Sequence, residues 1–236
     1  MHEFSIEREV ILPVDPEQVF AAITTGTAGW MFPTGGDPDI DANNSTNNPV
    51  KAWEPPNRLA IRQEADGWFN ALEYLIEARD GGTASLRYVH SGILVDDWDN
   101  QYDGASKHTD FYLHSLGEYL RHFAGRPVTY VSADGPPASG TPDALTTLRR
   151  ALGVDSAARV GDRVTIDVPG STPVDAEVDY TNEYFLGLRS AETLYRFYGR
   201  NNFGGTVDAA HHFFTDEIDH VATQLAWQNW LDNIYA

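Results

Sequence analysis

The chain has 236 residues, of which 42% are hydrophobic and 12% aromatic, so it can bury a sizeable core and is not globally disordered. Lys and Arg number 16 against 35 Asp and Glu, which gives a formal net charge of −19 at pH 7. Such a charge repels phosphates and anionic lipids, so nucleic acid is not an expected partner. The absence of cysteine excludes disulfides, thiol nucleophiles and cysteine metal sites.

Hydropathy predicts neither a targeting segment nor a membrane span. The amino-terminal stretch MHEFSIEREVILPV is charged and alternating, with no apolar signal-peptide core. No apolar run approaches the roughly 18 residues that a span requires. We therefore expect a cytoplasmic protein.

The first half of the chain predicts a strand, a short helix, a run of strands and a long helix. Residues 4–14 alternate as a strand does. A helix follows at 15–24, where Asp15 suits the N-cap and Pro16 the first helical position. Four strands are then expected, at residues 50–54, 58–65, 69–79 and 83–91.

The sequence of the first half also predicts a turn and the helix that ends this half. The sequence Asp-Gly-Gly at 80–82 predicts a hairpin, because glycine adopts positive φ without penalty. Residues 107–124 place apolar side chains on one helical face, and Gly125 suits the helix end. The acidic stretch 96–103 is expected to be an exposed loop or a lid over a cavity.

The sequence AWEPPNRLAIRQE at 52–64 interrupts a run of strands with two prolines. One strand ends near Trp53, and the next places Leu59 and Ile61 in alternation with polar residues. Proline donates no backbone hydrogen bond, so the pair at 55–56 predicts a corner between strands.

The second half repeats this order in reduced form, which we interpret as a degenerate internal duplication. Residues 126–140, rich in Gly, Pro and Ser, are expected to be a linker. A helix is predicted from Thr141 as N-cap, with Pro142 in the first helical position. Strands are expected at 162–168, 174–180, 184–189, 193–198 and 206–214.

The last helix is predicted over 215–235, with its N-cap at Thr215 or Asp216. The residues expected on its inward face are Ile218, Val221, Ala222, Leu225 and Trp230.

Several of these segments together resemble a known superfamily. They are VILPVDPEQVFAAIT, the Gly-Trp pair at 29–30, VKAWEPPNRLAIRQE, GGTASLRYVHSGI and the amphipathic helix that follows. The chain resembles the SRPBCC (START-like, Bet v 1-like) superfamily, and most of all its branch related to the activator of Hsp90 ATPase homologue. The resemblance covers residues 1 to about 125 and is weaker over 141–236, where it rests on element order.

The resemblance implies an α+β helix-grip fold. An antiparallel sheet would curl around a long carboxy-terminal helix, and a smaller, degenerate helix–sheet–helix repeat would follow. The expected domains are 1–125, which is START-like, and 141–236, which is a reduced copy, joined by the linker 126–140. The proline corner would let the sheet curl, with Leu59 and Ile61 facing the helix or the cavity.

The same resemblance places a largely apolar cavity between the sheet and the helix. Candidate ligand-binding residues are mainly aromatic, and an ordinary core is the alternative role for each of them. They are Phe20, Trp30, Phe32, Trp53, Trp68, Tyr74, Tyr88, His90, Phe111, Tyr112 and Ser115.

Catalysis is the alternative to binding alone. His90, His108 and His114 fall near a strand end and on the long helix, and a histidine of tuned pKa can act as an acid or a base. Either His90 or His114 would be the catalytic residue, with Tyr88, Tyr112 or Asp97 as its partner. A structural histidine is the simpler interpretation.

No metal and no cofactor are expected. The histidine pair at 211–212 lies in a predicted strand, so its two side chains point to opposite faces. Glu217 and His220 have the spacing of a di-iron motif but occur as one copy. The alternating aspartates of 37–41 lack the glycine and glutamate of a calcium loop.

The sequence therefore favours binding of a small hydrophobic or polyketide-like molecule without a catalytic motif. One alternative is a cyclase- or hydrolase-like enzyme. A second is a co-chaperone-like regulator of an Hsp90-type ATPase that meets a basic protein partner. Antibiotic self-resistance is a third. The identity of the ligand and the oligomeric state are left open.

Overall fold

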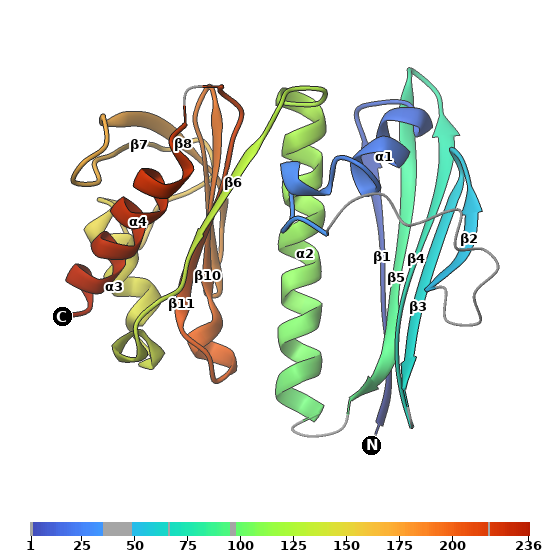
Figure 1. Cartoon of the computed structure of the whole chain (residues 1–236), viewed down its shortest axis with the longest axis horizontal. Helices are drawn as coiled ribbons and strands as arrows, with labels where there is room; N and C mark the ends of the chain where they lie inside the picture. The colour runs from blue at the N-terminus through green and yellow to red at the C-terminus, as the bar shows by residue number, and fades with distance from the viewer. Residues whose placement is uncertain (1, 35–48, 66, 95–97, 217) are drawn as a thin grey trace. The chain divides into compact units, whose positions relative to one another are not determined.

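The computed structural model describes residues 2–34, 49–65, 67–94, 98–216 and 218–236. The chain divides into two compact units, Met1–Ala124 and Gly125–Ala236. Each unit contains one antiparallel sheet, of five strands in the first and six in the second, together with helices (Figure 1). The α+β class with two antiparallel sheets, predicted from the sequence, is confirmed.

The first unit consists of a sheet with a long helix along one face (Figure 1). In chain order its elements are β1 (His2–Leu12), α1 (Pro16–Ile23), η1 (Thr27–Gly29), β2 (Val50–Glu54), β3 (Arg58–Ala65), β4 (Trp68–Arg79), β5 (Thr83–Leu94) and α2 (Trp98–His122). The strand order is β1-β5-β4-β3-β2, so the first strand pairs with the last. This arrangement is the helix-grip order that the sequence resemblance implies.

Local chemistry explains where these elements begin and end. The Asp15 side chain accepts a hydrogen bond of 2.9 Å from the Gln18 backbone N–H, which satisfies a free donor at the start of α1. Gly81 and Gly82 have φ of +76° and +72° in the turn between β4 and β5. Both features are confirmed as predicted.

The proline corner joins β2 to β3, and Asn57 anchors it to the next strand. Trp53 pairs with Leu59 across the hairpin. The Asn57 backbone N–H donates to the Glu54 carbonyl at 2.8 Å, and its side-chain amide donates to the Ile76 carbonyl at 3.0 Å. Leu59 is fully buried immediately after the corner.

The long helix begins earlier than the sequence pattern indicates. Residues 98–103, expected to be a loop or lid, form the first turns of α2, and residues 95–97 lie outside the described chain. The apolar face is buried as predicted, with Leu116, Tyr119, Leu120 and Phe123 in the core.

The second unit repeats this plan with shorter strands. Its elements are β6 (Thr129–Ala133), η3 (Pro137–Gly140), α3 (Ala144–Ala151), β7 (Arg163–Ile166), β8 (Val174–Thr181), β9 (Phe185–Arg189), β10 (Thr193–Gly199), η4 (Arg200–Phe203), β11 (Val207–Phe213) and α4 (His220–Ile234). The strand order is β6-β11-β10-β9-β8-β7, so the first strand again pairs with the last.

The segment expected to be a linker contains a strand of this sheet. β6 lies within 126–140 and pairs with β11, where Val131 faces His211 and Ala133 faces Ala209. Val131 and Ala133 are buried. The part of residues 126–140 that lies between the prolines is too short and too polar for its sequence pattern to predict a strand.

Both helix starts predicted in the second unit lie too early. α3 has Asp143 as its N-cap in place of Thr141, whose carbonyl instead accepts from the Ala144 N–H at 3.1 Å. α4 begins after Asp219, whose carboxylate accepts from the Ala222 N–H at 3.0 Å.

The inward face of α4 was predicted correctly at Trp230 but wrongly at Val221, Ala222 and Leu225, which are exposed. Val221 and Leu225 are 64% and 56% exposed, whereas Trp227, Trp230 and Leu231 are buried. The apolar residues of the helix are spread around its circumference, so their spacing defines no single stripe.

Among the described residues, no helix combines the length and the apolar composition needed to cross a membrane.

Candidate ligand-binding cavity

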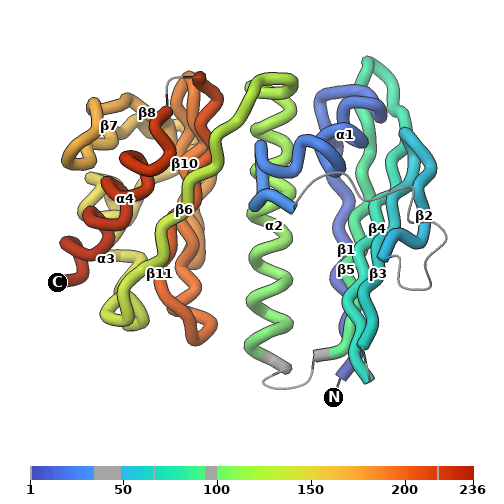
Figure 2. The backbone as a smooth tube through the Cα atoms, viewed as in Figure 1, coloured from blue at the N-terminus to red at the C-terminus, as the bar shows by residue number. Residues whose placement is uncertain are grey.

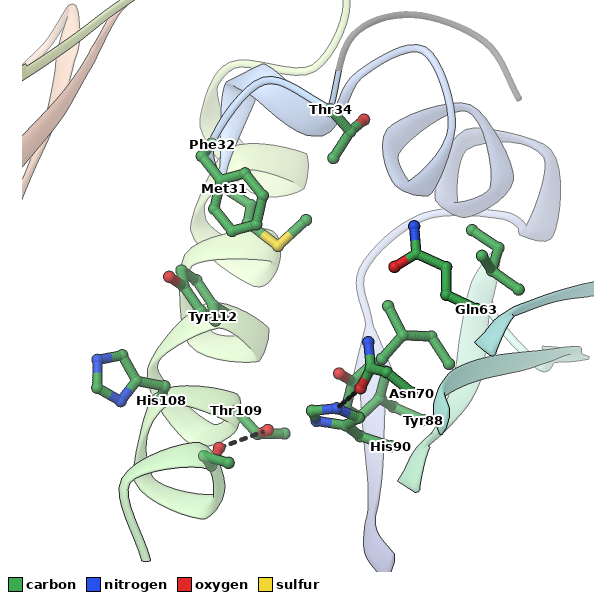
Figure 3. A pocket seen from close by; sticks show the side chains of 13 residues that line it. Met31, Phe32, Thr34, Gln63, Asn70, Tyr88, His90, His108, Thr109 and Tyr112 are labelled. Atoms are coloured by element: carbon green, nitrogen blue, oxygen red, sulfur yellow. Dashed lines mark hydrogen bonds between the residues drawn. The ribbon is translucent and has the colours of Figure 1, made fainter. Parts of the chain in front are cut away.

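A cavity of about 410 Å³ lies in the first unit between the sheet and α2 (Figure 3). Side chains from β3, β4 and β5 form one wall, and α2 forms the other. Met31, Phe32 and Thr34, which follow η1, close one end. The cavity therefore lies where the helix-grip arrangement predicts it.

The sheet wall follows from the period of two along each strand. Ile61 and Gln63 come from β3, Asn70 and Leu72 from β4, and Tyr88 and His90 from β5. The strand register pairs Gln63 with Asn70, Ile61 with Leu72, and Leu72 with His90. These six side chains thus share one face of the sheet.

The helix wall combines small and aromatic side chains at helical spacing. Ala105, Thr109 and Tyr112 recur four and three residues apart, which places them on one face of α2, and His108 also contributes. Ala105 and Thr109 project little volume toward the sheet. Their small size leaves the space that forms the cavity.

His90 and Asn70 form the main polar contact of the sheet wall (Figure 3). His90 Nε2 lies 2.7 Å from Asn70 Oδ1. Because the amide oxygen can only accept, the imidazole nitrogen is the donor. Burial lowers the pKa of His90 below its ordinary value, since the charged form loses solvation.

The tyrosine of the sheet wall is held in its neutral form. Burial raises the pKa of Tyr88, and the nearby Tyr74 raises it further. The two rings meet edge to face with centroids 5.2 Å apart. No Asp, Glu, Lys or Arg occurs among the residues that line the cavity in the described chain. The titratable side chains of this lining with a lowered or raised pKa, His90 and Tyr88, both favour their neutral forms.

Four of the residues predicted to bind ligand line this cavity: Phe32, Tyr88, His90 and Tyr112. They come from three different segments, and the fold brings them together. His108, considered only as a histidine in the sequence, lines it as well, and its Nδ1 donates to the Gly104 carbonyl at 2.7 Å.

The other predicted aromatic residues lie outside the lining. Phe20 is buried and contacts Trp53 edge to face at 5.1 Å. Trp30 is buried and its indole N–H donates to the Ala22 carbonyl at 2.9 Å, so its polar group is satisfied within the core. Tyr74 is buried beside Tyr88.

Three further predicted residues are also elsewhere. Trp68 is 36% exposed at the start of β4. Phe111 and Ser115 are fully buried on α2, but neither belongs to the cavity lining.

His90 and His114, the two histidines considered as catalytic residues, lie at different places in the fold. His114 lines a different depression of about 400 Å³, together with Arg8, Asp110 and residues near them. It follows Tyr112 by two positions, so it points to another side of α2. His90 and His114 therefore share no site, and Asp97 lies outside the described residues.

Of the metal-like patterns of the sequence, only the histidine pair 211–212 lies wholly within the described residues. In the described part of the chain, no group of three or more His, Asp or Glu side chains could hold a metal ion. His211 and His212 are both buried, the first against Trp227 at 4.1 Å and the second beside Tyr130 at 5.3 Å. Glu217 and residues 37–41 lie outside the described chain.

Sequence reasoning missed several residues of the cavity, namely Met31, Thr34, Gln63, Asn70, Ala105 and Thr109. The alternation of side chains along a strand was one signal that could have identified some of these residues. Once Tyr74 and Tyr88 are placed inward, the period of two places Asn70, Leu72 and His90 on the same face. No signal in the sequence identified the small helix residues as a cavity wall.

No protein-family model and no curated protein matches the chain. Solved structures similar to it include an AHSA1-like protein from Rhizobium etli, which is 25% identical with a TM-score of 0.37; the match covers 53% of this chain and 84% of that one. The Aha1 dimer from Colwellia psychrerythraea is 17% identical with a TM-score of 0.37, and the match covers 50% and 96% of the two chains.

DynU16, a protein in the dynemicin biosynthetic locus, is 14% identical with a TM-score of 0.37. That match covers 98% of this chain and 99% of DynU16.

Proposed function

We propose that the first unit binds a small, uncharged and largely apolar molecule in the cavity between its sheet and α2. The observation that carries this proposal is a cavity of about 410 Å³ without a charged residue in its described lining. Ligand sites in proteins are typically concave, about 300–1,000 Å³ in volume and mainly apolar, with a few polar groups that orient the ligand.

Electrostatics supports a neutral ligand. A charged molecule would lose its hydration on entry, and the described lining offers no opposite charge in return. Apolar contacts are available from Ile61, Leu72 and Phe32, whereas hydrogen-bonding groups are concentrated near Asn70 and His90. This distribution suits a molecule with an apolar body and one polar end.

Catalysis is not part of the proposal, because no observation favours it. The alternative uses either His90 or His114 as the acid or base, and the two line separate depressions, so they do not act together. We also propose that the second unit is a degenerate copy of the first, because in both sheets the first strand pairs with the last.

Binding of the neutral dye Nile red to the full chain tests this function. We expect an increase in dye fluorescence that saturates on titration. Ala105→Phe places a phenyl ring in the cavity and should weaken binding by about tenfold or more, as expected when a filled site no longer accommodates the dye. Val221→Phe adds the same ring at an exposed position of α4 and should leave binding unchanged.

Two results would refute the proposal. One is the absence of saturable dye binding by the unmodified chain. The other is equal affinity of the unmodified chain and Ala105→Phe, which would place the dye elsewhere on the protein.

A further inference from the structure

Most polar groups of the cavity already have hydrogen-bond partners within the protein. The Thr109 hydroxyl donates to the Ala105 carbonyl at 2.9 Å. The Thr34 hydroxyl lies 3.0 Å from that of Thr27. A ligand that took its hydrogen bonds from these hydroxyls would have to displace an existing partner, with little net gain.

Asn70 differs, because only one end of its amide has a partner. Its Oδ1 accepts from His90 Nε2 at 2.7 Å, whereas its Nδ2 has no hydrogen-bond partner among the described residues. Figure 3 shows this nitrogen directed away from His90 and toward the side of Gln63. Two N–H donors are therefore available at the cavity wall.

His90 fixes which end of the amide is available. Whether the imidazole is neutral or protonated, Nε2 can carry the proton that it donates to Asn70 Oδ1. While Nε2 carries the proton, turning the amide over would bring two donors together and lose this bond; a flipped amide is accepted only by the other neutral tautomer, whose Nε2 is an acceptor. In the Nε2–H form the Asn70 donors are held in a set direction, which lowers the entropy lost when a ligand accepts from them.

Gln63 stands directly across the strand pair from Asn70. Its side-chain amide also lines the cavity and has no partner among the described residues. Since no neighbour fixes its orientation, Gln63 can offer either its donor or its acceptor. It can add a second donor beside Asn70 but does not by itself select a ligand.

We propose, on the basis of the binding function above, that the cavity selects neutral ligands presenting a carbonyl-type acceptor oxygen to the Asn70 amide, with His90 as the positioning residue. A carboxylate would bring a negative charge that no cationic side chain of the described lining balances. A hydrocarbon of the same shape would leave the Asn70 donors unpaired, so it binds less tightly.

The test compares two neutral tricyclic probes of nearly equal shape, 9-fluorenone and fluorene, in equilibrium dialysis with the full chain. Only fluorenone has a carbonyl oxygen. One well-aligned hydrogen bond corresponds to a preference of roughly fivefold to tenfold for fluorenone. Asn70→Leu keeps the approximate shape and removes the donors, so it should bring the ratio of fluorenone to fluorene affinity to about one.

Two further variants separate positioning from packing. His90→Phe keeps a ring but releases the Asn70 amide, so the ratio of fluorenone to fluorene affinity should fall at least severalfold. A merely structural role for His90 would change both affinities equally. Asn233→Leu makes the same substitution at an exposed position of α4 and should preserve the preference.

The outcomes distinguish this inference from the proposed function. If the unmodified chain binds both probes equally, or if Asn70→Leu keeps the preference, acceptor selection is wrong and the binding function stands. If Nile red binds but neither tricycle does, acceptor selection is again wrong. If the chain binds none of the three, the proposed function fails and this inference fails with it.

Discussion

In the first unit α2 faces its sheet with Ala105 and Thr109, whereas in the second unit α4 faces its sheet with Trp227. The indole of Trp227 lies 4.1 Å from the ring of His211 and 5.8 Å from that of Phe197. One helix leaves a cavity of about 410 Å³ over its sheet, and the other inserts a buried ring. Both helices follow the last strand of a sheet in which the first strand pairs with the last (Figure 2).

This difference shows that strand order permits a cavity but does not create one. Protein interiors are close-packed, so an empty volume persists only where neighbouring side chains are too small to fill it. The small residues on α2 satisfy that condition. In the second unit the large side chain of Trp227 fills the space beside the sheet. The comparison can be tested with substitutions that change the size of side chains in the two units.

The largest expected effect comes from opening the second unit. Trp227→Ala removes a buried indole that also packs on Tyr195 and Trp230, at 5.9 and 5.5 Å. We expect the free energy of unfolding, measured by urea denaturation, to fall by about 3–5 kcal/mol. A loss below about 1 kcal/mol would show that this unit relaxes to fill the space.

Leu225→Ala is the matched control on the same helix. Leu225 is 56% exposed, so its truncation should change stability by only about 0.5 kcal/mol.

The next effect concerns pH, because each unit has a histidine on its sheet with reduced solvent exposure, half-buried His90 in the first and buried His211 in the second. Burial lowers the pKa of His211 well below its ordinary value, and the neighbouring His212 and Arg196 lower it further. The pKa of His90 is lowered by burial as well. A lowered folded-state pKa means that the unfolded chain binds the proton first, so stability is greatest above the ordinary value near 6.5.

We therefore expect the free energy of unfolding to fall as the pH decreases from about 7 to about 5, by up to roughly 1.4 kcal/mol per pH unit for each such histidine. His211→Asn should flatten this dependence more than His90→Asn, because His211 is almost fully buried. His2→Asn, at an exposed position of β1, serves as the control. An unchanged slope in His211→Asn would contradict the assignment.

The smallest effect tests a feature that the two units share. Asp15 caps α1 and Asp219 caps α4, each through a carboxylate that accepts a backbone N–H. Asp15→Ala and Asp219→Ala should each lower the free energy of unfolding by about 1 kcal/mol. Asp143 precedes α3 without a side-chain capping bond, so Asp143→Ala should change it by less than about 0.5 kcal/mol. Equal losses in all three variants would argue against capping as the cause.

Much of the secondary structure could be predicted from the sequence, because its signals are local. The β4–β5 hairpin follows from alternation on both sides of Gly81 and Gly82, and α1 from Asp15 and Pro16. The errors occur where local signals conflict. The first turns of α2 are acidic and resemble a loop, and β6 lies in a stretch that resembles a linker.

The cavity could be predicted only in part. Tyr88, His90 and Tyr112 follow from element order and aromatic content, but Trp30 and Phe20 belong to the core although their residue types are similar. Whether an aromatic ring lines a cavity or fills a core depends on the volume of the residues opposite it, which are distant in the chain.

The sequence by itself determined most strands and helices, the cap of α1 and the β4–β5 turn, because these depend on neighbours within a few residues. Only the tertiary structure decided that His90 meets Asn70 on a neighbouring strand while His114 points elsewhere. It also decided that Ala105 leaves space where Trp227 fills it. Cavities and polar pairs arise from contacts between elements, and packing across the sheet settles which side chains meet.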